Sequence, residues 1–539
     1  MNSYTTSSYS WDDTSFSTVF SQDYLGSFPI LQKFYDFNPD EKGLDEALKQ
    51  RQKYATPRED LAKSLFEQYE KMEKDFFVNP ENDVVHRNIE LLKKDNTFTV
   101  TTGHQPLFLG GQLFFFYKIV SAINQAAYLQ KKYPDFNIVP VFWMASEDHD
   151  FEEVSKATLF GKEQKWQKEV DNEPVGSLDP SGCLDVLNEL KPKLEETHNG
   201  KFIFDLFERA YNRCGTFACA TRYWLNRLFR NKGLIILDPM DQRLKQHIKD
   251  IAQKDIIERK YFQLVNDSKE ELQKKYKTPV NPREINFFLF ENGKRLRLKE
   301  ESGKISTDDG SRQFSEEELQ KIINESPEKL SPNVVTRPLF QEKLLPNISY
   351  VGGPSEIAYW MELKTSFRET GIFFPAITLR NSAVWIGKGL SKKINKLQIP
   401  ADLFLEEKDK LVDKFLEKKE NNQQLENEIA SLEASLESLK SIASGQHSDI
   451  QKKILDFAVP QSKGVQKFRK ELNKAFKAKN EAELEQLLKI YDRLFPNGNP
   501  QERVDNFIPY YLDHGGNFLA RLLDFMKPIG GEVLIFSDE

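Results

Sequence analysis

The chain has 539 residues, of which 39% are hydrophobic and 12% aromatic, enough for a sizeable core. This length exceeds the usual size of one domain, so we expect two or more structural units. The net charge of −7 comes from interleaved acids and bases, which excludes a protein that presents a long basic surface to nucleic acid.

The cysteine content and the absence of long apolar runs indicate the environment. Cys183, Cys214 and Cys219 are too few and too scattered for a disulfide framework or a zinc site, which indicates buried or inert thiols. No run approaches the ~20 apolar residues that span a bilayer, and residues 1–17 resemble no secretory leader. We therefore expect a protein of the reducing cytoplasm with no membrane partner.

The first half of the chain predicts a parallel sheet. Residues 1 to about 95 are predicted to be mostly helical, with apolar residues at helical spacing. A strand over 96–103, a helix over 113–134 and a nearly continuous apolar strand that starts at 137 and runs into acids follow. This order predicts a βαβ unit in a parallel sheet covered on both faces.

Further strands of the same sheet are predicted at 233–239 and 371–387. Two insertions separate the predicted strands, one at about 155–230 and one at about 255–345, the second with meandering strands. Loops beyond strand ends tolerate such insertions. The fold class is therefore α/β, with a core that spans residues 1–399.

Residues 400–495 have a different character, long and charged. A heptad seam predicts a helix of about 40 residues, roughly 60 Å long at 1.5 Å per residue. The seam residues are Leu425, Ile429, Leu432, Leu436, Leu439 and Ile442. Ser444 and Gly445 break the helix, and Pro460 and Gly464 are expected to interrupt the return arm.

We interpret residues 400–495 as a helical hairpin that projects from the body. A helix packed flat on the core is the alternative, which so narrow a seam disfavours. Residues 496–539 are predicted to return to the core with one helix and a short strand.

The end of the first predicted strand is the first candidate site. Ligands of open α/β sheets bind beyond the carboxyl ends of the strands, and free N–H groups at a helix start suit phosphate or carboxylate. His104 would supply a donor or a proton relay; a strained turn capped by polar side chains is the alternative. The candidate contacts are Thr102, Gly103, His104, Gln105 and Gly111.

The segment SEDHDFEE, residues 146–153, ends the next apolar strand, and six of its eight residues can ionise. Asp148 or His149 would orient or deprotonate an amine, with Asp150 as a further contact. A histidine–carboxylate cluster also suits a metal, and a solvated acidic loop is the third interpretation. No second histidine cluster stands at ligand spacing, so we expect no dedicated metal.

Two later segments add candidates. Near the junction at 352–356, Tyr350, Ser355, Glu356 and Tyr359 are placed to face a ligand, although caps are mostly structural. Asn381 follows the predicted strand residues FFPAITL, 373–379. An adenine-sized pocket where the hairpin meets the body is predicted from the following residues, a packed joint being an equal alternative: Arg503, Asn506, Tyr510, Tyr511 and Asp513.

Four blocks in this order, residues 101–118, 140–154, 350–360 and 496–503, closely resemble the BshC family of bacillithiol biosynthesis. The resemblance implies a ligase that joins L-cysteine to the amine of glucosaminyl malate, with ATP-dependent activation of a carboxylate. It also implies a Rossmann-like core related to class I nucleotidyl transferases, with two inserted connecting subdomains, and a homodimer formed through the coiled coil.

The resemblance further implies an adenine nucleotide, ATP or ADP, near the coiled coil, with Mg²⁺ only as the companion of the nucleotide. His104 and Gly103 would contact an anion, and Asp148 and His149 would position or deprotonate the amine. Glu356, Tyr359 and Asn381 would contact sugar or malate. The chain departs from the synthetase pattern, because residues 101–111 are not a clean HIGH motif and no KMSKS-like loop occurs.

Two other functions remain compatible with the residues themselves. A metal-dependent hydrolase or amidase would use residues 146–150 as ligands. A non-enzymatic scaffold would bind a ligand in the body and a partner through the hairpin.

Overall fold

The computed structural model describes residues 4–73, 83–301, 303–420 and 423–539. At its centre is a five-stranded parallel sheet in the order β13-β12-β2-β3-β6. Because the chain starts at β2, builds outward to β6, and then returns to the other side of β2, the order reverses between β2 and β12. This confirms the predicted α/β class. The strands are β2 (Thr97–His104), β3 (Asn137–Met144), β6 (Ile235–Leu237), β12 (Asn347–Gly352) and β13 (Ala376–Leu379).

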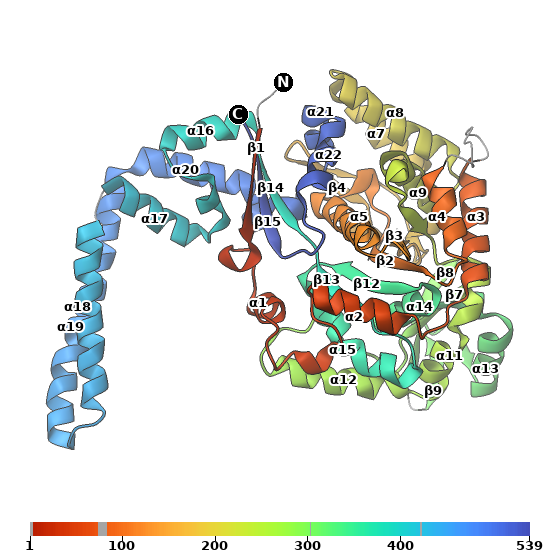
Figure 1. The fold of residues 1–539 in the computed structure, drawn as a ribbon, viewed down its shortest axis with the longest axis horizontal. Helices are drawn as coiled ribbons and strands as arrows, with labels where there is room; N and C mark the ends of the chain where they lie inside the picture. The colour runs from red at the N-terminus through yellow and green to blue at the C-terminus, as the bar shows by residue number, and fades with distance from the viewer. Residues whose placement is uncertain (1–3, 74–82, 302, 421–422) are drawn as a thin grey trace.

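Strand β2 shows why the sheet is buried on both faces. Phe98 and Val100 pack into one apolar cluster, against residues of α2 (Glu41–Arg51) and α5 (Leu113–Lys132). On alternate positions, Thr101 donates a hydrogen bond of 2.9 Å to the Asn347 amide oxygen of β12, so its buried hydroxyl is satisfied. Helix α5 also provides the crossover between β2 and β3 (Figure 1).

Two segments interrupt the sheet along the chain. Between β3 and β6 lie α6 (Phe151–Val154), β4 (Lys156–Leu159), β5 (Lys162–Lys165), α7 (Cys183–Leu194), α8 (His198–Arg213) and α9 (Phe217–Phe229). Between β6 and β12 lie α10 (Gln242–Lys245), α11 (Lys249–Ala252), α12 (Lys260–Gln273), α13 (Glu316–Glu325) and α14 (Arg337–Leu344). An antiparallel sheet accompanies them, with β7 (Phe287–Glu291), β8 (Lys294–Glu301), β9 (Lys304–Thr307), β10 (Gln313–Phe314) and β11 (Leu330–Pro332).

The amino-terminal part, predicted to be mostly helical, contains a strand as well as helices. Helices α1 (Val19–Leu25), α3 (Arg58–Glu73) and α4 (Val84–Leu91) form, while residues 74–82 lie outside the described residues. However, β1 (Tyr4–Ser10) is a strand, paired antiparallel with β15 (Glu532–Asp538). Its sequence is polar and largely exposed, so pairing with the other end of the chain, and not local pattern, defines it.

Two other predicted elements are divided in the structure. The strand predicted at 371–387 is two strands, since β14 (Ser382–Ile386) leaves the central sheet after β13 and pairs with β15. The predicted final helix is α21 (Ile508–His514) and α22 (Gly516–Phe525), separated at Gly515 by a positive φ of 58°. A further helix, α15 (Pro354–Thr370), follows β12.

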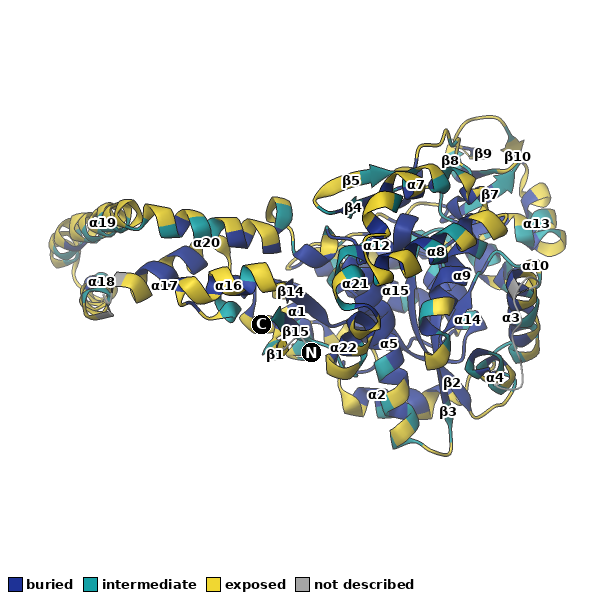
Figure 2. Ribbon diagram, turned by 90° about the horizontal axis from the view of Figure 1, so that it is seen from above, coloured by how far each residue is buried: buried dark blue, intermediate teal, exposed yellow. Residues whose placement is uncertain are grey.

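The hairpin projects from the body (Figure 1) and is mostly exposed (Figure 2). It is built from α16 (Lys388–Leu397), α17 (Lys408–Glu420), α18 (Gln423–Ala443), α19 (Ser448–Lys479) and α20 (Glu481–Leu494). The predicted 40-residue helix crosses residues 421–422, which lie outside the described part. The predicted interruption at Pro460 and Gly464 is wrong, since α19 runs through both; on an exposed helix, the carbonyl that proline leaves unpaired can bond water.

No helix in the described ranges is both long and apolar enough to cross a bilayer.

A buried ion pair attaches the carboxy-terminal segment to the core. The Arg380 guanidinium donates to both carboxylate oxygens of Glu502, at 2.6 and 3.1 Å, and also to Ser382 Oγ at 2.8 Å. The two side chains are 2% and 1% exposed. Such a bidentate pair fixes the relative position of its partners, so it holds the turn that carries Arg503 against the end of β13.

We predict that Arg380→Met lowers the free energy of unfolding by about 3–5 kcal/mol, because it leaves the Glu502 carboxylate buried without its cation. Urea denaturation followed by circular dichroism measures the loss. The double variant R380M/E502L removes both charges and should recover most of it. Equal stability of R380M and the wild type would contradict the structural role of this pair.

Candidate functional site

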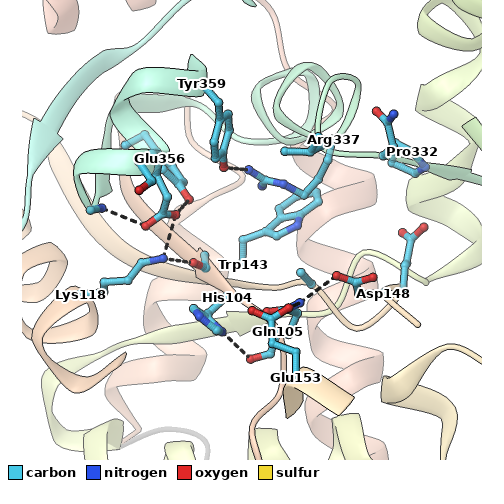
Figure 3. Close-up of a pocket in the computed structure, with 18 of the residues that line it drawn as sticks. His104, Gln105, Lys118, Trp143, Asp148, Glu153, Pro332, Arg337, Glu356 and Tyr359 are labelled. Atoms are coloured by element: carbon cyan, nitrogen blue, oxygen red, sulfur yellow. Dashed lines mark hydrogen bonds and ion pairs between the residues drawn. The ribbon is translucent and has the colours of Figure 1, made fainter. Parts of the chain in front are cut away.

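A cavity of about 440 Å³ lies at the carboxyl ends of β2, β3 and β12, where the strand order reverses (Figure 3). The parallel register of β2 and β3 pairs His104 with Met144, so residues that follow both strands meet at one rim. Gln105 Nε2 donates to Asp148 Oδ2 at 2.8 Å and to Glu153 Oε2 at 2.9 Å. The two candidate segments therefore converge, as their position in adjacent parallel strands predicts.

The structure places about half of the predicted site residues on the wall of this cavity. They are Gly103, His104, Gln105, Asp148, Tyr350, Ser355, Glu356, Tyr359 and Arg503. The others bond within the protein: Thr102 Oγ1 donates to the Val351 carbonyl at 2.8 Å, Asn381 Nδ2 to the Lys527 carbonyl at 2.8 Å, and Asp150 caps α6. Gly111 lies before α5, at φ +63°.

The residues predicted to bind a nucleotide are divided between this cavity and other contacts within the protein. Of that set, only Arg503 lines the cavity. Asn506 is fully buried and donates to the carbonyls of Leu109 and Gly111, at 2.9 and 2.7 Å. Tyr510 donates to Asp505 at 2.6 Å, Tyr511 stacks on Phe202, and burial raises the pKa of Asp513. For Asn506 and Tyr510 these contacts favour the packed-joint interpretation.

A buried charge network supports the floor of the cavity. Lys118, with 2% of its side chain exposed, lies 2.8 Å from Glu356 Oε1 and also donates to the Gly103 carbonyl. Tyr350 donates to the same carboxylate at 2.8 Å, and the Gly353 N–H to its other oxygen at 2.9 Å. Burial raises the pKa of Glu356, but Lys118 and these hydrogen bonds outweigh it and hold the pKa below its ordinary value.

Burial, and then the charge of Lys118, lower the pKa of His104 to about 4. Its Nδ1 lies 3.2 Å from the Gln105 carbonyl oxygen, which can only accept. The ring therefore carries its proton on Nδ1, and Nε2 is left as a hydrogen-bond acceptor at neutral pH.

Acidic groups gather where β3 ends. Burial, with Asp150 and Asp148 nearby, raises the pKa of Glu153. Asp148 Oδ1 lies 3.4 Å from Arg295 Nη1, which donates at 2.9 Å to His149 Nδ1; burial and then Arg295 lower the pKa of His149. His149 is thus the partner of Arg295, and not part of the cavity wall.

Two arginines that line the cavity have no carboxylate partner among the described residues. Arg337 donates to the Tyr359 hydroxyl at 3.1 Å and to Gln341 at 2.9 Å, both neutral groups. Within the described residues, neither Arg337 nor Arg503 has a carboxylate within 4.0 Å, whereas Lys118, Arg295 and Arg380 each have one. Two cations therefore remain to bind a negatively charged ligand.

The indole of Trp143, which lines the cavity, has a buried Nε1–H without a hydrogen-bond partner among the described residues. The N–H itself is closed off from solvent, so the structure does not present it to a ligand in the cavity.

Sequence reasoning missed Lys118, Trp143, Arg295 and Arg337. Lys118 had a readable signal, because it is the sole charge between residues 113 and 130. Arg295, on β8, and Arg337, on α14, come from the second insertion and carry no motif. Among the described residues, those at 146–150 included, no group of three or more His, Cys, Asp or Glu side chains is arranged to hold a metal ion.

Comparison with known proteins identifies the family. The model of the N-terminal Rossmann-like domain of bacillithiol biosynthesis BshC matches residues 6–381, and that of its C-terminal coiled-coil domain matches 383–537. The chain belongs to the BshC family. Relatives named "Putative cysteine ligase BshC" include proteins of Flavobacterium johnsoniae, 35% identical over 94% of this chain and 95% of theirs, and of Christiangramia forsetii, 32% identical over 99% and 100%.

The match to the BshC models confirms the resemblance read from the four sequence blocks, the Rossmann-like core and the coiled coil. Among solved structures, one named a putative arginyl-tRNA synthetase, from Campylobacter jejuni, aligns with 78% of this chain and 92% of that chain. Its identity of 11% and TM-score of 0.22 are too low to support an argument.

We predict that His104 makes stability depend on pH between about 6.5 and 4. In the folded protein its pKa is about 4, below the ordinary value of 6.5, so only the unfolded chain takes up the proton in this interval. The contribution of neutral His104 to the free energy of unfolding is therefore fully present above pH 6.5 and is lost as the pH falls toward 4. Urea denaturation at several pH values gives the free energy of unfolding as a function of pH. We expect this free energy to change less steeply with pH in His104→Gln than in the wild type. Identical slopes would contradict the buried, neutral imidazole.

Proposed function

We propose that this chain is a cytoplasmic ligase that forms an amide between the carboxyl of L-cysteine and the amine of glucosaminyl malate. The name of the curated relatives supports the reaction class. The observation that carries the proposal is a cavity lined by two acids, Asp148 and Glu153, and by two arginines without a carboxylate partner, Arg337 and Arg503; Figure 3 shows Asp148, Glu153 and Arg337. A substrate with both an amine and carboxylates complements such a cavity.

The unpaired arginines suit the malate part of the substrate. Its two carboxylates are planar anions that accept the fork of an arginine guanidinium. Arg337 is held in position by Tyr359 and Gln341, and Arg503 by the attachment of its neighbour Glu502 to Arg380.

The part of the cavity that carries Asp148 and Glu153 suits the reacting amine. Asp148 and Glu153, bridged by Gln105, would bind the ammonium form, and Glu153, whose pKa burial raises, would take one proton so that the neutral amine can attack the acyl group. After attack on an activated carboxyl, the nitrogen becomes strongly acidic, so even a weak base such as neutral His104 can take its proton at Nε2. Glu356 and Lys118 stay paired with each other, so the charges next to the His104 imidazole do not change.

Carboxyl activation by ATP, with Mg²⁺ as its companion, remains part of the proposal through the family resemblance. The residues predicted to hold the adenine nucleotide do not fit that role as a set, because Asn506 and Tyr510 bond within the protein. We therefore assign no step to the nucleotide and no residue to its base.

We also propose that the coiled coil joins two copies. Ile429 and Leu436 of the seam are buried within the hairpin, each 5% exposed, whereas Leu432 and Ile442 are 50% and 53% exposed. The seam is thus wider than one hairpin can cover. Exposed apolar residues in such a row are typical of a protein interface.

We predict that Arg337→Met lowers ligation at least 100-fold, mainly through a higher KM for glucosaminyl malate, because it removes a charge-assisted pair to a carboxylate. The measurement is mass-spectrometric detection of the cysteinyl adduct, with purified protein, L-cysteine and ATP. Arg312→Met, which removes an arginine that pairs with Glu291 and does not line the cavity, is the matched control and should retain activity. Full activity of R337M would remove this arginine from the site, and no adduct with the wild type would overturn the function.

For the coiled coil, we predict that Leu432→Glu combined with Ile442→Glu converts a dimer to a monomer, since it places charges in the proposed apolar interface. Light scattering after size exclusion gives the mass, and circular dichroism reports whether the helices are retained. Glu437→Gln, an exposed position on the same helix, is the control. A variant that stays dimeric, or a wild type that is monomeric, would refute assembly through this seam.

A further inference from the structure

Two of the three cysteines, interpreted from the sequence as scattered and inert, lie together in the fold. The Sγ atoms of Cys214 and Cys219 are 2.7 Å apart. Cys214 ends α8 and Cys219 lies in the first turn of α9, and both are free thiols. A disulfide needs about 2.05 Å between its sulfur atoms, so closing this gap takes a shift of roughly 0.7 Å.

The two thiols differ in a way that gives each a role. The Cys214 hydrogen bond lowers the pKa of Cys219 against the effect of burial, and Arg222, one turn along α9, lowers it further. Cys219 is also near the positive end of the helix dipole, just after the N-cap Thr216. The same hydrogen bond, together with burial, raises the pKa of Cys214. Cys219 is therefore the more acidic thiol of the pair, the one that ionises first.

The pair can be reached from solvent. Cys219 is partly exposed, Cys214 is 7% exposed, and the intervening Gly215 and Thr216 are exposed. Cys183 differs, because it is fully buried and burial raises its pKa well above the ordinary value. No metal-ligand cluster of three or more groups includes the pair among the described residues, which leaves thiol chemistry as its use.

We propose that Cys214 and Cys219 form a reversible redox site, a dithiol that low-molecular-weight disulfides oxidise to an intramolecular disulfide. The Cys219 thiolate attacks one sulfur of the reagent and forms a mixed disulfide, releasing the first small thiolate. Cys214 gives up its proton and attacks the Cys219 sulfur, releasing the second small thiol. The protein loses two electrons and the reagent gains them, so one disulfide is consumed for each one formed.

The test uses the folded full-length chain and oxidised glutathione as the probe. After acid quenching, the protein is denatured, alkylated with N-ethylmaleimide and mapped by mass spectrometry. We expect the reduced protein to be labelled at all three cysteines and the oxidised protein at Cys183 alone, with a cross-linked Cys214–Cys219 peptide. Dithiothreitol should restore full labelling. Labelling of all three cysteines after oxidation, or a cross-link that forms only in urea, would overturn the proposal.

Single substitutions separate the two roles. Cys214→Ser should trap Cys219 as a mixed disulfide with glutathione, whereas Cys219→Ser should give neither adduct nor cross-link. Cys183→Ser is the matched control and should still form the cross-link. An unmodified Cys219 in C214S would overturn its assignment as the attacking thiol. If a variant does not fold, the labelling pattern of the wild type still decides the main point.

Discussion

A lysine inside an apolar helix imposes the central constraint on this fold. Lys118 is carried by α5 into the space behind β2, where an unpaired ammonium would be costly. Its partner is Glu356, in the first turn of α15. The pair therefore links α5, which connects β2 to β3, with α15, which connects β12 to β13. The pairing fixes the distance between the two halves at the point where the strand order reverses.

Other features of the cavity depend on that attachment. Glu356 also accepts from Tyr350 and from the Gly353 backbone, which fixes the strand-to-helix turn after β12. The charge of Lys118 contributes to keeping His104 neutral. The other buried charges at the cavity are paired in this way. Arg337 and Arg503 differ from them because they have no carboxylate partner, which their contacts show and their residue type does not.

The parallel sheet and its rim were predictable because they follow from local pattern. Apolar strands and a long apolar helix specify the βαβ unit, and the rule that strand ends share a rim then brings His104 and Asp148 together. Arg295 and Arg337 were not predictable, because they reach the cavity from an insertion whose placement depends on long-range packing. For the same reason the proximity of Cys214 and Cys219 depends on the angle between α8 and α9, which residue spacing does not specify.

The antiparallel pairing of β1 with β15 has a consequence for how the chain is made. Tyr4 faces Asp538, so the backbone groups of β1 stay without their strand partner until β15 has been made. During synthesis on the ribosome the central sheet can form before β15 is made, and β1 stays unpaired in that interval. Arg503 is also made late, because it follows the hairpin in the chain. Emergence of the carboxy-terminal strand is thus the event that closes the molecule into one cooperative unit.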